Sequence, residues 1–111
     1  MDNKAKVDGL LRRAEEALAE ARVLGQKVLG ETATRDAYNR AADNMTSQAP
    51  PFPLGPVEES IENANYLTLR AHADAADARA EVLRSELERA HQRAQNLIDE
   101  ARRLKGLQPK R

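Results

Sequence analysis

The chain has 111 residues, with 18 basic and 18 acidic side chains that leave no formal net charge, and it lacks cysteine and tryptophan. This length allows one domain at most, and the lack of cysteine excludes disulfides, thiolate metal sites and cysteine nucleophiles. The balanced charge argues against a dedicated nucleic-acid-binding protein, and three aromatic residues offer little for stacking on bases or sugars.

The first predicted element is a helix over residues 3–48, rich in Ala, Leu, Glu and Arg. Ten of twelve positions spaced by three and four residues are apolar, which is a heptad repeat typical of a coiled coil. These twelve positions are Val7, Leu10, Ala14, Ala17, Ala21, Leu24, Val28, Glu31, Arg35, Tyr38, Ala42 and Met45. Because Gly25 and Gly30 weaken a helix, we expect a kink or a short break near residues 30–34.

The two polar residues in this first seam are Glu31 and Arg35. They stand four residues apart with the acid on the N-terminal side, the favourable orientation for an ion pair on one helix. Three interpretations remain open: a solvated pair, a polar contact that sets the register of the seam, or a contact with a partner or ligand.

Four of the five prolines lie within residues 50–56. Proline is excluded from helix interiors, so the first helix must end before this segment. The spacing of Pro50 and Pro53 also occurs in polyproline ligands, but no basic residue flanks it, and we predict a rigid turn.

A second helix is predicted over residues 57–105, followed by a basic tail over 106–111. All twelve of its seam positions are apolar: Tyr66, Leu69, Ala73, Ala76, Ala80, Leu83, Leu87, Ala90, Ala94, Leu97, Ala101 and Leu104. If the chain folds back at the proline segment, facing residues have numbers that add up to 111, as for Leu24 and Leu87. A register shifted by one heptad would also place the apolar seam of one helix against that of the other.

A second set of apolar residues recurs on the predicted second helix, away from the seam. Its members are Val57, Ile61, Ala64, Ala71, Ala75, Ala78 and Val82. One interpretation is that exposed alanine simply favours the helix. The other, which we adopt, is an intersubunit surface through which two hairpins complete a four-helix bundle.

The remaining candidate residues indicate no chemistry. Glu88 and His91 match the Glu-x-x-His spacing of helical di-iron sites, but both lie off the seam and no second such motif exists. His72 stands alone and is expected at the surface. We therefore predict no catalytic, cofactor-binding or metal-binding residue and no small-molecule substrate, and hence no enzyme.

The C-terminal end is basic, with Arg102, Arg103, Lys105, Lys110 and Arg111. Cations near a helix C-terminus complement its dipole, and Gly106 suits the position that ends a helix. A contact with an anionic partner, such as an acidic protein or nucleic acid, is the alternative.

The size and two-helix plan are similar to those of secreted actinobacterial helical hairpins of the type VII class. The turn of that class carries Trp-x-Gly, whereas this one reads Phe52-Pro53-Leu54-Gly55. Its C-terminal Tyr-x-x-x-acid signal is also missing, since Tyr66 is followed four positions later by Arg70. The resemblance therefore covers the plan and not the motifs.

Taken together, these patterns predict an all-α, antiparallel two-helix hairpin that forms a single domain over residues 1–111. We expect a non-enzymatic structural or protein–protein interaction protein, acting first as a homodimer or else with another helical protein. The bias toward Arg over Lys suggests a high-GC origin, such as an actinobacterial or phage assembly component. The alternatives are an exported type VII-like hairpin that works with a partner and a small regulator that binds through its basic end.

The first 30 residues contain no apolar run of signal-peptide length, and no segment is long and apolar enough to span a membrane. We therefore expect a cytoplasmic protein, or a virion-associated one if it is of phage origin. Export without a leader stays open. No membrane partner is expected.

Overall fold

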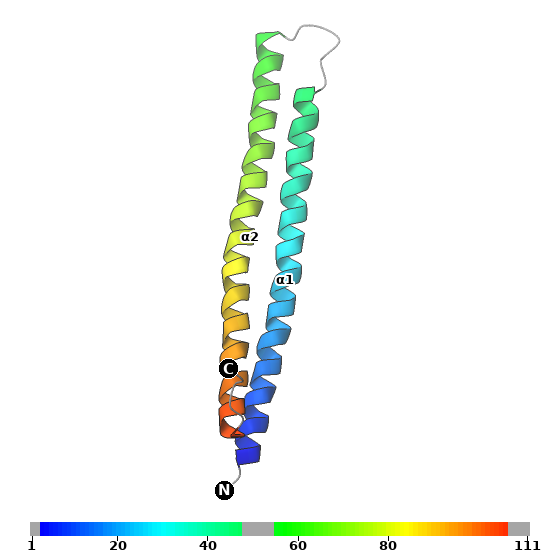
Figure 1. Cartoon of the computed structure of the whole chain (residues 1–111). Coiled ribbons are helices and arrows are strands. Elements are labelled where there is room, and N and C mark those ends of the chain that lie inside the picture. Colours follow the sequence, from blue (N-terminus) through cyan, green and yellow to red (C-terminus); the bar gives the residue numbers. More distant parts are fainter. Residues whose placement is uncertain (1–2, 48–54, 107–111) are drawn as a thin grey trace. The chain divides into compact units, whose positions relative to one another are not determined.

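The computed structural model describes residues 3–47 and 55–106, and these residues form two helices (Figure 1). Helix α1 spans Asn3–Ser47 and helix α2 spans Pro56–Leu104. The expected ranges, 3–48 and 57–105, differ from these by at most one residue at each end. The described residues contain no strand, so the all-α class is confirmed for this part of the chain.

Both ends of α2 follow from local chemistry. The carbonyl oxygen of Gly55 accepts a bond from the backbone nitrogen of Glu59 at 2.9 Å. Pro56 takes the first helical position, where its missing N–H costs nothing. At the other end Gly106 has φ 75° and its nitrogen donates to the carbonyl of Arg103 at 3.0 Å. The predicted stop at Gly106 is therefore confirmed. Most of the predicted proline turn, and residues 107–111 of the basic tail, lie outside the described residues.

The chain divides into two compact units. Unit 1 contains the described residues 3–26 and 83–106, and unit 2 contains 27–47 and 55–82. In each unit a segment of α1 packs along a segment of α2.

Unit 1 holds a hydrophobic core on the two predicted seams. Ala21, Leu24 and Ala90 form a buried cluster, and Leu83 and Leu87 pack against it. The remaining buried residues of unit 1 are Val7, Ala14, Ala17, Ala94, Leu97 and Ala101. An ion pair between Glu20 and Arg93, at 2.9 Å, lies beside this core. The residue numbers of each facing pair thus add up to about 111, as predicted, and the two segments are antiparallel.

Unit 2 has a core of alanine. Its buried hydrophobic residues are Ala42, Ala73, Ala76 and Ala80, which all lie on the predicted seams. The larger seam residues, such as Val28, are only half-buried. Burial stabilises by about 25 cal/mol per Å² of apolar area. An alanine core therefore contributes less than the leucine-containing core of unit 1.

The expectation of a break near Gly30 is wrong, because α1 continues without interruption through this region. The hydroxyl groups of Thr32 and Thr34 donate to the carbonyls of Leu29 and Gly30, each at 3.0 Å, within the helix. A glycine costs about 1 kcal/mol in helix propensity relative to alanine. That cost is smaller than the loss of several backbone hydrogen bonds that a break would bring.

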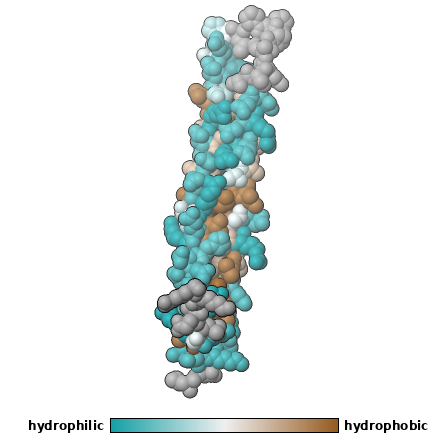
Figure 2. All heavy atoms as spheres, viewed as in Figure 1, coloured by the Kyte–Doolittle hydropathy of each residue, from teal (hydrophilic) through white to brown (hydrophobic). Residues whose placement is uncertain are grey.

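The visible surface is mainly hydrophilic. Figure 2 shows one face, on which hydrophobic side chains appear among hydrophilic ones. Exposed large apolar residues nevertheless occur in both units, among them Val23 in unit 1 and Ile61 in unit 2. Within the described ranges, neither helix has a stretch apolar enough to cross a bilayer.

Candidate interaction surface

The second apolar set of α2 lies at the surface of unit 2, and we call it the outer face. Its members are Val57, Ile61, Ala64, Ala71, Ala75, Ala78 and Val82, and all seven are exposed. Val57 retains 69%, Ile61 55% and Val82 60% of its accessible area. Helix α1 therefore does not cover these side chains.

The outer face and the seam lie on nearly opposite sides of α2. Successive residues of an α-helix are about 100° apart, which puts the middle of the outer face about 150° from the middle of the seam. The seam side carries the buried Ala73, Ala76 and Ala80. In unit 2 this helix is thus apolar on two sides, of which one is covered, and this pattern is typical of a helix that packs against more than one neighbour.

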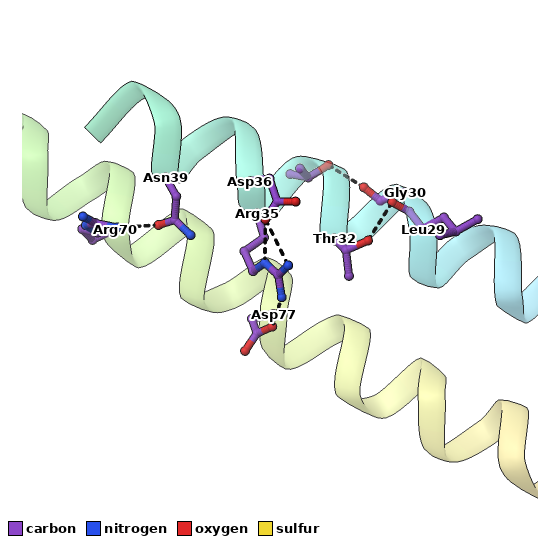
Figure 3. A network of polar contacts seen from close by, with 9 residues as sticks. Leu29, Gly30, Thr32, Arg35, Asp36, Asn39, Arg70 and Asp77 are labelled. Atoms are coloured by element: carbon purple, nitrogen blue, oxygen red, sulfur yellow. Dashed lines mark hydrogen bonds and ion pairs between the residues drawn. The ribbon is translucent and has the colours of Figure 1, made fainter. Parts of the chain in front are cut away.

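Polar contacts fasten α1 to α2 within unit 2. The Nη1 atom of Arg35 donates to Oδ1 of Asp77 at 2.9 Å, and its Nε atom donates to Oδ1 of Asp36 at 3.0 Å (Figure 3). These hydrogen bonds to Asp77 and Asp36 raise the pKa of the Arg35 guanidinium above its usual value. Arg35 therefore stays charged while it points from α1 toward α2.

Glu31 also makes a contact between the helices, an ion pair with Arg79. In the predicted register Glu31 faces Ala80, and its observed partner is the adjacent residue, Arg79. Arg35 faces Ala76, and its observed partner is the adjacent residue, Asp77. The structure thus places both residues against α2, where the sequence suggested an ion pair along one helix. Both contacts join the two helices, and the side chains of Asp77 and Arg79 keep 48% and 56% of their area exposed.

A second polar group surrounds Arg70. Its guanidinium donates to Oδ1 of Asn39 at 2.7 Å, to Oδ1 of Asp43 at 2.8 Å and to the hydroxyl of Tyr66 at 3.1 Å. The carbon at its centre lies 5.3 Å from the centre of the Tyr66 ring. The hydrogen bond to Tyr66 raises the pKa of Arg70, and the charge of Asp43 acts in the same direction.

The cross-helix contacts of Arg70 and the stacking of His72 on Tyr38 were not predicted from the sequence. The two rings of that pair have centres 5.0 Å apart and planes 24° apart. A signal was present, because the numbers of His72 and Tyr38 add up to 110 and those of Arg70 and Asn39 to 109. The polar pairs of unit 2 therefore agree with the predicted register, as does the core of unit 1.

The ion pair between Arg35 and Asp77 should make a small contribution that depends on salt. We expect Arg35→Gln and Asp77→Asn each to lower the melting temperature slightly, with the double variant losing less than the two single losses combined. Because solvent screens exposed charges, the coupling should shrink at molar salt. Thermal denaturation followed by circular dichroism measures the coupling. A coupling that does not change with the salt concentration would contradict this prediction.

The other candidate residues do not come together in a site. Glu88 and His91 are exposed on unit 1, and the structure shows no group of three or more potential metal ligands within its described ranges. Arg102, Arg103 and Lys105 are exposed around the C-terminal end of α2, where they complement the helix dipole. Lys110 and Arg111 fall outside the described residues.

The outer face is therefore an exposed apolar surface of unit 2 that the packing of α1 against α2 does not use. Comparison of the chain with models of protein families, with curated proteins and with solved structures found no match.

Proposed function

We propose that this protein is a non-enzymatic structural or interaction protein that works by binding helical partners, in the first place a second copy of itself. The observation that carries the proposal is the outer face of α2, whose apolar side chains are exposed on the side opposite to the seam. In this proposal two copies associate through these faces, which brings their four helices together in one assembly.

The small core of unit 2 supports this proposal. Its buried residues are alanines, whereas Val57, Ile61 and Val82 remain mostly exposed. Burial of a large aliphatic side chain is worth about 1.5–3 kcal/mol, so covering these three would offset much of what the alanine core lacks. Contiguous exposed apolar surface in a folded protein commonly marks an interaction site.

The test is the mass in solution across a range of protein concentrations, measured by size-exclusion chromatography with light scattering. We expect a species of about twice the chain mass of 12.3 kDa. Ile61→Glu should shift it to the monomer, because the substitution places a charge within the apolar interface.

Val23→Glu is the matched control, because Val23 has the same exposed fraction as Ile61, 55%, but lies on α1 in unit 1. We expect this variant to keep the mass of the wild-type species. Far-UV circular dichroism should show both variants to be helical. A wild-type chain that is fully helical and monomeric at every concentration would refute the proposal.

A further inference from the structure

The outer face of α2 has an internal symmetry that its individual residues do not reveal. Reversed end for end, it again has a valine at each end and small side chains in the middle, while the large Ile61 takes the place of the small Ala78. Val57 corresponds to Val82, Ile61 to Ala78, and Ala64 to Ala75, and in each pair the residue numbers add up to 139. The centre of this arrangement lies level with Leu69 and Arg70.

We propose that the outer face of α2 binds the same face of a second copy in antiparallel orientation, around a two-fold axis at the level of Leu69 and Arg70. This inference rests on the proposed function and specifies its partner and geometry. A two-fold axis requires a surface that is complementary to itself, which the reversed order of side chains provides.

The packing favours the antiparallel arrangement. The middle of the face carries only small side chains, Ala64, Thr68, Ala71 and Ala75, so the two helices can approach closely there. Ile61 then meets Ala78 of the other copy, which pairs a large side chain with a small one. In a parallel pair Ile61 of one copy would meet Ile61 of the other. These two large side chains would hold the helices apart, and voids would remain between the alanines that follow.

The charges beside the face fit the same arrangement. Glu58 and Arg79 are three heptads apart, so they lie along the same flank of the outer face. In the antiparallel pair, Glu58 of one copy and Arg79 of the other lie at nearly the same height along the helix axis. Their heights differ by about 3 Å. The symmetry produces this contact twice. Arg79 bonds Glu31 through its Nε atom, and a guanidinium has four further N–H donors.

This geometry also fixes the order of the helices around unit 2. Because the outer face and the seam lie on nearly opposite sides of α2, the two α2 helices would form the centre of the assembly. The α1 segment of each copy would lie beyond its own α2. The four helices would therefore form a row and not a square bundle.

Cysteine cross-linking tests the orientation, and the chain has no native cysteine to interfere. Ala64→Cys and Ala75→Cys are made as two separate full-length variants, one carrying a mass tag, and are oxidised under mild conditions alone and mixed. In the antiparallel pair, position 64 faces position 75, so we expect at least tenfold more disulfide-linked dimer in the mixture than in either variant alone. Two copies of position 64 would be about 16 Å apart along the axis, beyond the reach of a disulfide.

The control mixture pairs Ala64→Cys with Ala33→Cys, which is an exposed position on α1 of unit 2, and it should give only the background of random collisions. Efficient cross-linking of Ala64→Cys alone would indicate a parallel pair and overturn the inference. A dimer by light scattering without the cross-link in the mixture would also overturn it, while leaving the proposed function in place. A monomer at every concentration would refute both.

Discussion

Replacing Leu24 by alanine should lower the free energy of unfolding by about 2–4 kcal/mol. Leu24 retains 7% of its accessible area and forms the buried cluster of unit 1 together with Ala21 and Ala90. The two buried neighbours, Ala21 and Ala90, are too short to fill the space that the truncated side chain leaves. Urea denaturation followed by far-UV circular dichroism measures the loss.

Leu29→Ala provides the comparison on the same helix. Leu29 is 63% exposed, so its truncation should change the free energy of unfolding by less than about 0.5 kcal/mol. The same chemical change thus has a large effect on the seam and a small one away from it. Equal losses in the two variants would mean that α1 does not bury the seam side of its surface.

Ala90→Asp should have a still larger effect and leave the chain mostly unfolded at neutral pH. The side chain of Ala90 is fully buried in unit 1. An unpaired carboxylate at such a position costs several kcal/mol, which approaches the total stability of a small domain. Far-UV circular dichroism should show the loss of helix directly.

Low pH should partly rescue this variant. Burial raises the pKa of the introduced carboxyl group in the folded state above its value in the unfolded chain. The free-energy cost of burying the charged carboxylate is therefore complete above that raised pKa, and it disappears as the pH falls below about 4. Ala90→Asn has nearly the same shape without the charge and should show no such recovery. Ala19→Asp, at an exposed position of α1, should stay folded at neutral pH.

The sequence contained enough information to predict the seams and their register within each unit. A heptad repeat specifies which side of a helix is buried without reference to its partner, and this is why Ala73, Ala76 and Ala80 could be assigned to the core from their spacing alone. The prolines then indicated where the first helix ends and where the second begins. Only a few registers place one seam on the other, and the one centred on the turn is the one observed.

The polar contacts could be predicted only in part. Long side chains such as those of Arg35 and Arg70 reach residues one or two positions away from the facing residue, and several acids stand within that reach. The register alone therefore does not decide which acid is bound. The expectation of a break near Gly30 was wrong for a related reason. Helix propensity depends on the local sequence, whereas the contacts that hold α1 against α2 join residues far apart in the chain.

The alanine core of unit 2 has a consequence for how stability is distributed along the two helices. Local opening costs least where few large apolar side chains are buried, and this condition is met in the described part of unit 2, residues 27–47 and 55–82. The same residues carry the outer face. A partner that covers that face would bind the part of the molecule with the smallest core of its own, and folding and association would then be thermodynamically linked.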